Sequence, residues 1–262
     1  MCGTCGCDHQ EKTTITTFNT IKHHSHLHEH GIPHSHDNEK IVTIKENVTH
    51  YNDVLAQKNR EYFESNHIMA LNFVSSPGAG KTTLLVQTIS HLKNKFFFSV
   101  IEGDQQTLND AERIKATGVP VVQVNTGDGC HLDSDMISKA LESLETSRFS
   151  ILAIENVGNL VCPAMFDLGE NKRVVIVSVT EGEDKPLKYP NMFASADVCV
   201  ISKVDLLPHL TFDFEKLIEN VRRVNPKLTI IEYSALHHED KWNTWLENEF
   251  LHYVNKHDKK DL

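Results

Sequence analysis

The chain has 262 residues, of which 39% are apolar and 24% charged, so it can bury a large hydrophobic core and is no peptide-sized scaffold. Its formal charge of −10 opposes nonspecific attraction to nucleic acid or to an anionic membrane, and we expect neither as a partner. No apolar run approaches the ~20 residues that span a bilayer, and the opening MCGTCGC does not resemble a secretory signal. We therefore expect a cytoplasmic protein with reduced thiols.

Residues 1–46 form an arm that is rich in metal-binding side chains and poor in large apolar ones. Three thiols, Cys2, Cys5 and Cys7, are followed by the run HHSHLHEHGIPHSH, which holds His23, His24, His26, His28, His30, His34 and His36. We expect this arm to be disordered without a ligand. The CxxCxC spacing lets three thiolates converge with a nitrogen donor, which suits Zn²⁺ or Ni²⁺. Flexible thiols without a partner and an incidental His run remain alternatives.

Residues 47–262 are predicted to form one α/β domain. The stretch VTHYNDVLAQKNREYFESN predicts a leading helix whose apolar face holds Val48, Tyr51, Leu55, Tyr62 and Phe63. Short apolar runs then alternate with amphipathic stretches, a pattern of repeated βα units that predicts a doubly wound, mostly parallel sheet. The expected strands are 69–75, 97–102, 120–125, 150–155, 173–179, 197–202 and 228–233. The expected later helices are 81–93, 106–117, 133–145, 212–224 and 238–256.

The first of these strands runs into SSPGAGKTTLL, which matches the phosphate-binding pattern GxxxxGK(S/T) except that Ser75 stands at the first glycine position. In this pattern, loop N–H groups and a helix N-terminus cradle the phosphates, the Lys neutralises their oxygens, and the hydroxyl ligates Mg²⁺. We therefore expect a nucleotide on the loop formed by Pro77, Gly78, Ala79, Gly80, Lys81, Thr82 and Thr83.

Carboxylates that could hold the Mg²⁺ stand at the ends of two predicted strands. Asp104 follows one strand, and Glu155 ends another, three residues before Gly158. This last spacing allows a backbone N–H to sense a γ-phosphate. Either carboxylate could instead cap the next helix, and Asp128 is a weaker candidate.

The choice of base is indicated by VISKVDLL, in which Lys203 and Asp205 match the end of the NKxD guanine signature. The carboxylate of Asp205 can accept hydrogen bonds from guanine N1–H and the 2-amino group together, a pair of donors that adenine lacks. GTP is therefore favoured over ATP, although Ser202 stands where the signature has Asn. The segment YSAL, with Ser234 and Ala235, resembles the loop that completes a guanine pocket.

A second set of metal ligands is predicted inside the domain. Cys130 and His131 follow one predicted strand, and Cys162 comes seven residues after Glu155. Both segments leave the carboxyl ends of parallel strands, where nucleotide also binds in such folds, so these ligands can respond to the phosphate state. The fourth donor would be water, another side chain or a second subunit, and a second subunit would make the metal a bridge in a symmetric dimer. Inert buried thiols beside a loop histidine remain the alternative.

Taken together with EGDQQTLNDAERI, TGDGCHLD, ENVGNLVCP and TEGEDKPLKYP, these motifs resemble the HypB family, the nickel-handling GTPases of [NiFe]-hydrogenase maturation. The resemblance covers the chain from Ile68 onwards and its N-terminal tip. It implies a P-loop NTPase fold of SIMIBI type and a homodimer when GTP is bound. It also implies delivery of Ni²⁺ to the hydrogenase large-subunit precursor together with a HypA-type chaperone.

The resemblance also implies roles for individual residues. The nickel motif of the family matches Cys2, Cys5 and Cys7, and its internal Ni/Zn site matches Cys130, His131 and Cys162. The catalytic set is Lys81, Thr82, Asp104 and Glu155, of which the last three hold Mg²⁺. The residues expected to contact GTP or GDP outside the phosphate loop are Gly158, Lys203, Asp205, Ser234 and Ala235.

We expect a metal-delivery switch in which GTP and Mg²⁺ order Asp104 and residues 155–163 and so change the internal metal site. A coupling of ~1–3 kcal/mol would change metal affinity about five- to 150-fold. Intrinsic turnover should be slow, because no obvious Gln or Arg stands beside the attacking water. The alternatives are a nickel or zinc store dominated by the arm, and an accessory GTPase of another nickel enzyme such as urease.

Overall fold

The structure is a computed structural model of the chain, and it describes residues 14–17, 38–105, 108–237 and 241–258. The predicted ligands Cys2, Cys5 and Cys7 and the seven histidines of the arm lie outside the described residues. Within the described ranges, no helix has both the length and the apolar character needed to cross a membrane.

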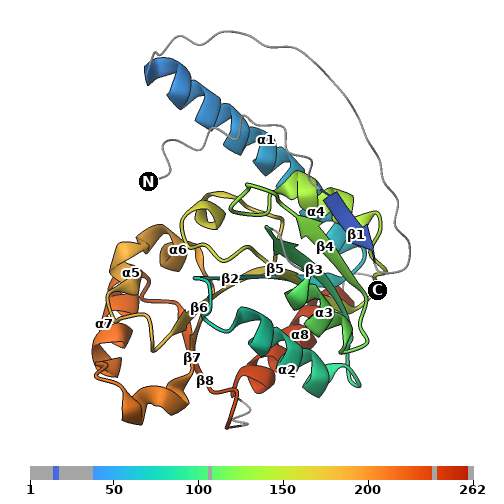
Figure 1. Cartoon of the computed structure of the whole chain (residues 1–262). Helices are drawn as coiled ribbons and strands as arrows, with labels where there is room; N and C mark the ends of the chain where they lie inside the picture. Colours follow the sequence, from blue (N-terminus) through green and yellow to red (C-terminus); the bar gives the residue numbers. More distant parts are fainter. Residues whose placement is uncertain (1–13, 18–37, 106–107, 238–240, 259–262) are drawn as a thin grey trace.

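One sheet forms the centre of the molecule, with the strand order β1-β4-β3-β5-β2-β6-β7-β8 (Figure 1). Strands β2 to β8 are parallel, and β1 pairs antiparallel with β4 at the edge. The predicted parallel α/β architecture is therefore confirmed. The strands are β1 (Thr14–Thr17), β2 (Ile68–Ser75), β3 (Phe97–Asp104), β4 (Val121–Asn125), β5 (Ser150–Glu155), β6 (Lys172–Ser178), β7 (Val198–Ser202) and β8 (Thr229–Tyr233).

Helices cover both faces of this sheet. The α-helices are α1 (Asn38–Ser65), α2 (Lys81–Leu92), α3 (Asn109–Lys115), α4 (Ser134–Leu141), α5 (Lys185–Lys188), α6 (Pro190–Ser195), α7 (Phe214–Val224) and α8 (Lys241–Asp258). Two 3₁₀ helices, η1 (Cys162–Met165) and η2 (Val204–His209), follow β5 and β7. All seven predicted strands and the longer helices are present, whereas β1, α5, α6 and the 3₁₀ turns were not predicted.

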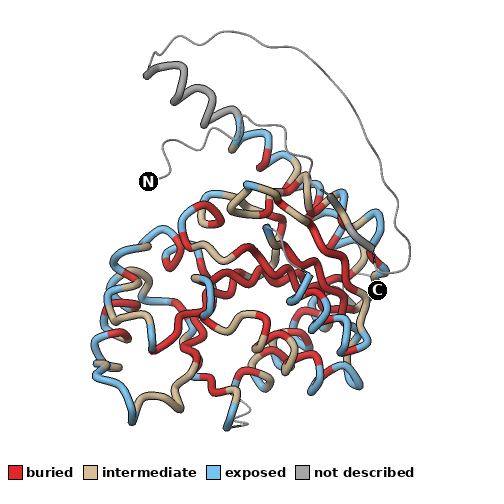
Figure 2. Tube along the Cα trace, in the orientation of Figure 1, coloured by how far each residue is buried: buried red, intermediate tan, exposed pale blue. Residues whose placement is uncertain are grey.

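Alternating residues of each strand point to opposite faces and build the core on both sides. In β5, Ile151 and Ala153 pack with α2, α3 and α8, whereas Leu152 and Ile154 pack with α1 and α4. A further cluster on this second face packs β6 and β7 against α6 and α7. Because both faces are covered, the central strands are buried along their length (Figure 2), as parallel sheets require.

Helix α1 confirms the predicted leading helix but begins at Asn38, and the predicted apolar face is wrong. Phe63 is buried, but Val48, Tyr51 and Tyr62 are exposed. The helix docks through polar as well as apolar side chains, and hydrophobic periodicity does not detect the polar ones. From Val48 onwards, where its burial is described, the residues that it buries are Asn52, Ala56, Asn59 and Phe63.

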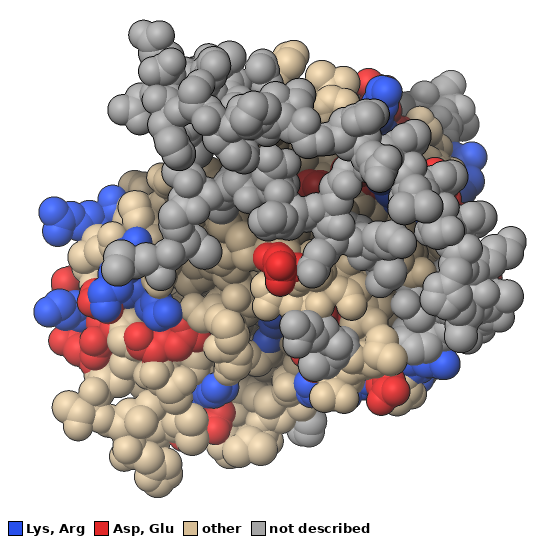
Figure 3. All heavy atoms as spheres, turned by 45° about the horizontal axis from the view of Figure 1, so that its top comes forward, with Lys and Arg blue, Asp and Glu red and all other residues tan. Residues whose placement is uncertain are grey.

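Charged side chains of both signs lie intermixed over the face shown in Figure 3, among the residues that the structure describes. Charges of opposite sign that lie close together largely cancel one another's field at distances greater than their spacing. The described part of this face therefore presents mixed charge to a partner.

Candidate nucleotide and metal sites

A cavity of about 500 Å³ opens at the carboxyl ends of β2, β3 and β5. Its floor is the loop between β2 and α2, and its walls carry acidic side chains from β3 and β5. The predicted site residues that line it are Pro77, Gly78, Gly80, Lys81, Thr82, Thr83, Asp104, Glu155, Gly158 and Lys203. The structure thus brings together most of the nucleotide site predicted from the sequence.

The phosphate loop leaves the N-terminus of α2 open to an anion. Gly80 is the N-cap of α2 with a φ of 99°, in the left-handed region that favours glycine, and no side chain caps the helix. The first N–H groups of α2 are therefore available to phosphate oxygens, and the helix dipole favours the negative charge. Lys81, the first residue of α2, points its Nζ to within 3.5 Å of Glu155 Oε1.

Glu155 is arranged as a cation ligand. Its Oε1 accepts a hydrogen bond of 2.6 Å from Thr82 Oγ1, and its buried Oε2 has no hydrogen-bond partner. Burial raises the pKa of Glu155, and the neighbouring Lys81 opposes that shift. A buried carboxylate oxygen beside a hydroxyl and a second carboxylate, Asp104, fits a hard divalent cation such as Mg²⁺.

Glu102 is a cavity residue that the sequence reading missed. It is 2% exposed and lines the same cavity as Glu155, its partner in the β3–β5 pairing. Burial, with the charges of Glu155 and Asp104 as further causes, raises the pKa of Glu102 to about 8. The period of two in a strand could have revealed it, because Glu102 and Asp104 are two residues apart and share a face.

The predicted base-binding residues lie at the ends of β7 and β8. Ser234 Oγ donates a hydrogen bond of 2.6 Å to Asp205 Oδ1, which fixes the carboxylate. Ser202 Oγ donates to Ala79 O at 2.6 Å, so this serine ties the strand to the phosphate loop where the signature has Asn. Asp205, Ser234 and Ala235 are not among the residues that line the cavity.

Asp128, the weaker carboxylate candidate, is exposed and does not line the cavity. Lys185, which lies in the segment TEGEDKPLKYP and was assigned no role above, donates a hydrogen bond of 3.0 Å to Ser76 Oγ in the phosphate loop. This contact places the segment after β6 against the nucleotide site.

Cys130, His131 and Cys162 form a compact ligand cluster, as the sequence predicted. Their ligand atoms all lie within 4.8 Å of one another, and Cys130 Sγ donates to Cys162 Sγ at 2.8 Å. Burial lowers the pKa of His131, which favours the neutral imidazole that binds metals. Two thiols and an imidazole suit Ni²⁺ or Zn²⁺ and leave a fourth position for another donor.

The two sites are in direct contact. Asn159 Nδ2 donates to Cys130 O at 3.2 Å, and Gln105 Nε2 donates to Gly129 O at 3.2 Å. A Cβ atom on Gly103 would lie 2.7 Å from the Leu132 side chain, so only glycine lets the residue after His131 pack on the strand that ends at Asp104. Residues 129–132, which we call the metal loop, therefore rest on β3, which ends at Asp104, and on the segment that follows Glu155.

Comparison with known proteins agrees with this geometry. Residues 69–232 match the family described as CobW/HypB/UreG, nucleotide-binding domain. The chain is 55% identical over 211 residues to the hydrogenase maturation factor HypB of Rhizobium leguminosarum bv. viciae, covering 80% of this chain and 71% of that protein.

Two solved structures share the fold. One is HypB from Helicobacter pylori in complex with nickel, at 38% identity and a TM-score of 0.69, covering 80% of this chain and 96% of that one. The other is HypB from Archaeoglobus fulgidus, at 38% identity and a TM-score of 0.71, covering 76% of this chain and 98% of that one. On the family match and these identities, the chain belongs to the CobW/HypB/UreG family and, within it, to the HypB hydrogenase maturation factors.

Proposed function

We propose that this chain is a GTP-hydrolysing nickel metallochaperone for [NiFe]-hydrogenase maturation. GTP binding promotes a homodimer, and nickel passes from the internal site to the hydrogenase large-subunit precursor with the help of a HypA-type chaperone. The observation that carries the proposal is the contact between the two sites, in which the metal loop hydrogen-bonds to residues that follow both candidate Mg²⁺ carboxylates.

The nucleotide half of the function rests on the cavity. The α2 N-terminus and Lys81 would neutralise the β- and γ-phosphates, while Asp205, held by Ser234, would accept the guanine donors. A bound Mg²⁺, held by Thr82, Asp104 and Glu155, would supply charge neutralisation at the phosphates. Arg113 lines the cavity and donates to Thr83 Oγ1 at 2.9 Å; because it would have to leave this partner to reach an attacking water, we expect slow turnover.

The metal half rests on Cys130, His131 and Cys162. Their donor set suits nickel, and the solved Helicobacter pylori HypB, a 38% identical relative, is in complex with nickel. Three donors from one chain leave room for a ligand from a partner subunit, a client or water. Nickel held in this way can be passed on, because a site with an open position exchanges its ligand more readily than a closed one.

The experiment that tests the proposal measures nickel affinity in both nucleotide states. The full chain carries Cys2→Ala, Cys5→Ala and Cys7→Ala, which we call the three-alanine background, so that thiolate-to-nickel charge-transfer absorption reports the internal thiols. Titrations with GDP and with a non-hydrolysable GTP analogue should give affinities that differ about five- to 150-fold. Coinciding curves would contradict the delivery switch and favour a nickel or zinc store.

Hydrolysis is tested separately with Lys81→Ala. Removing the ammonium group that faces the phosphates should abolish most GTP hydrolysis. Lys95→Ala is a matched control, because in the described part of the chain Lys95 pairs with Glu247 on α8 in an exposed salt bridge. A Lys81→Ala protein that hydrolyses GTP at the normal rate would refute the assignment of the phosphate loop.

A further inference from the structure

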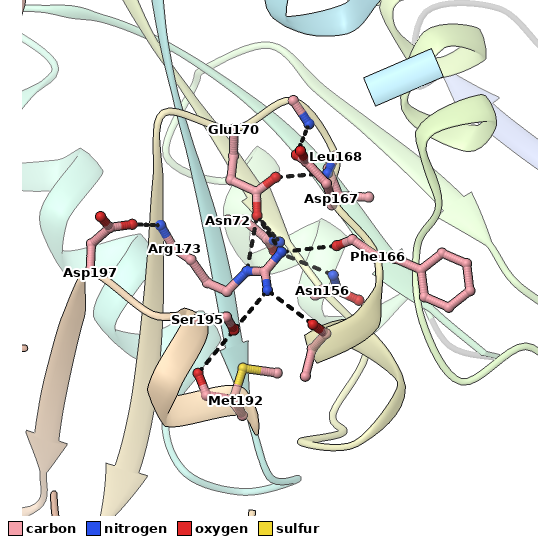
Figure 4. Close-up of polar contacts among 12 residues, drawn as sticks. Asn72, Asn156, Phe166, Asp167, Leu168, Glu170, Arg173, Met192, Ser195 and Asp197 are labelled. Atoms are coloured by element: carbon pink, nitrogen blue, oxygen red, sulfur yellow. Dashed lines mark hydrogen bonds and ion pairs between the residues drawn. The ribbon is translucent and has the colours of Figure 1, made fainter. Parts of the chain in front are cut away.

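A network of buried polar side chains crosses the sheet face opposite α2 and α8 and has no role in the chemistry above (Figure 4). Its members are Asn72, Asn156, Glu170 and Arg173. Asn72 is completely buried in the middle of β2, and Asn156 is 1% exposed. Buried polar groups cost free energy unless they are hydrogen-bonded, and every member of this network is.

One end of the network holds the segment after Glu155 against the metal loop. Asn156 directly follows Glu155, and its Oδ1 accepts hydrogen bonds from Val157 N–H at 3.0 Å and from Leu132 N–H at 3.1 Å. Leu132 directly follows the ligand His131. A single side-chain oxygen therefore joins the nucleotide-facing segment to the loop that carries two metal ligands.

The other end holds the turn that carries the third ligand, Cys162. Arg173 Nη2 donates to Phe166 O at 2.9 Å, and Arg173 Nη1 lies 3.5 Å from Ala164 O, within η1. The Phe166 ring in turn packs on the His131 imidazole, with 4.0 Å between the ring centroids. Arg173 thus fixes the backbone on which Cys162 and the contact to His131 depend.

Asn72 is the link between the two ends. Asn156 Nδ2 donates to Asn72 Oδ1 at 3.3 Å, and Asn72 Nδ2 donates to Glu170 Oε1 at 3.1 Å. The same Glu170 oxygen accepts from Arg173 Nε at 3.0 Å and from Nη2 at 2.8 Å. The network therefore runs unbroken from residue 156 to residue 173.

The direction of every hydrogen bond in this network is fixed. A carboxylate only accepts, so Asn72 must turn its amide nitrogen to Glu170 and its oxygen to Asn156. Asn156 must then donate to Asn72, which leaves its oxygen for the two backbone N–H groups. Neither amide can flip without setting acceptor against acceptor, so a shift at one end is passed to the other rather than absorbed.

We propose that Asn72 and Asn156 are positioning residues that couple the nucleotide site to the internal metal site. When the bound nucleotide changes, residues 155–158 move and carry Asn156 with them. The network then shifts Leu132 on one side and the turn at 164–166 on the other, which changes the spacing of the two thiolates and the imidazole. This inference rests on the proposed function, in which nucleotide state alters nickel affinity.

The decisive test cuts the link without touching either site. Asn72→Ala, made in the three-alanine background, contacts neither the cavity nor a metal ligand. Nickel affinity is measured by charge-transfer absorption with GDP and with a non-hydrolysable GTP analogue. The readout is the ratio of the higher of these two affinities to the lower. A network that only stabilises the fold would lower both affinities alike and leave the ratio unchanged. A coupling network changes the ratio.

We expect Asn72→Ala to lower that ratio at least about fivefold, because it removes the buried hydrogen bonds to both Asn156 and Glu170, and to leave the affinity for GDP within about twofold of the parent. Tyr253→Phe is the control, because it removes a buried hydrogen bond, of 3.0 Å to Ile68 O, at the first residue of β2 and outside the network. Its ratio should equal that of the parent.

A second variant guards against misfolding of the first. Asn156→Asp keeps the acceptor for Val157 and Leu132 but sets a carboxylate oxygen against Asn72 Oδ1, so it should lower the ratio in the same way. If the parent ratio is above five and both variants keep it, the inference is wrong and the proposed function stands. If the parent ratio is one, both are wrong.

Discussion

The ion pair between Arg173 and Glu170 makes a prediction about stability that does not depend on any ligand. Their side chains are 9% and 5% exposed and lie 2.8 Å apart, and Arg173 also donates to Ser195 Oγ at 2.9 Å. Arg173→Met would leave the Glu170 carboxylate buried without its cation and the carbonyl of Phe166 without its donor.

The expected loss is about 3–5 kcal/mol, the usual result of removing one partner from a buried pair. Domains of this kind are stable by about 5–15 kcal/mol, so the variant should lose about a fifth or more of its stability. Urea unfolding followed by tryptophan fluorescence measures this, since Trp242 is buried in the core that α8 forms with the sheet. Lys172→Met is the matched control, because its pairing with Glu249 is about one-third exposed and worth about 0–1 kcal/mol.

The double variant Glu170→Gln with Arg173→Met separates the ion pair from the other contacts of Arg173. Removing both charges leaves no unpaired buried ion, so the double variant should lose less stability than the sum of the two single losses, by about 1–3 kcal/mol. Losses that add within about 0.5 kcal/mol would refute the reasoning, because they would show that the two side chains do not interact in the folded protein.

Three further predictions concern the site and its support. The pKa of Glu102 is raised to about 8, so its contribution to stability is fully present below pH ~4.5 and is lost as pH rises towards 8. In EDTA, the free energy of unfolding measured with urea should therefore fall less steeply over this range in Glu102→Gln. An unchanged slope would contradict the shift. Ser234→Ala should weaken GDP binding about three- to tenfold, because Asp205 loses its orienting hydrogen bond, and calorimetry that shows equal affinity would contradict this role. Gly103→Ala should cost about 1–3 kcal/mol through its clash with Leu132, and Leu132→Ala should relieve that clash in the double variant; a double variant with fully additive losses would exclude the clash.

The sequence predicts the frame of the molecule well because two strong signals agree there. Short apolar runs fix the parallel strands, and the phosphate loop fixes which strand feeds a helix N-terminus. The short helices α5, α6 and η1 were missed because elements of four to six residues show no periodicity. In helix α1 the apolar face was predicted only in part correctly, because Asn52 and Asn59 make tertiary hydrogen bonds beside the buried Ala56 and Phe63.

The sequence allowed site residues to be predicted only where side chains that bind phosphate or metal come at or after the end of a strand. Lys81, Thr82, Glu155 and the cysteine ligands follow such ends, so their residue types revealed them. Asn72 stands inside an apolar strand, where a single polar residue gives no indication of its partner. That partner is Glu170, 98 residues away, and such a separation in sequence becomes a contact only when the sheet has formed.

The order of the strands explains why the metal site lies beside the nucleotide site. Cys130 and His131 follow β4, and Cys162 follows β5, while β3 lies between these two strands in the sheet. Ligands that leave two strands on either side of β3 meet across β3 near its carboxyl end, where Leu132 packs on Gly103 and Asp104 ends the strand. The three ligands therefore come from strands on both sides of the strand that carries one candidate Mg²⁺ ligand, and Cys162 follows the strand that carries the other. Coupling between the two sites is thus favoured by the topology itself, before any side-chain network adds to it.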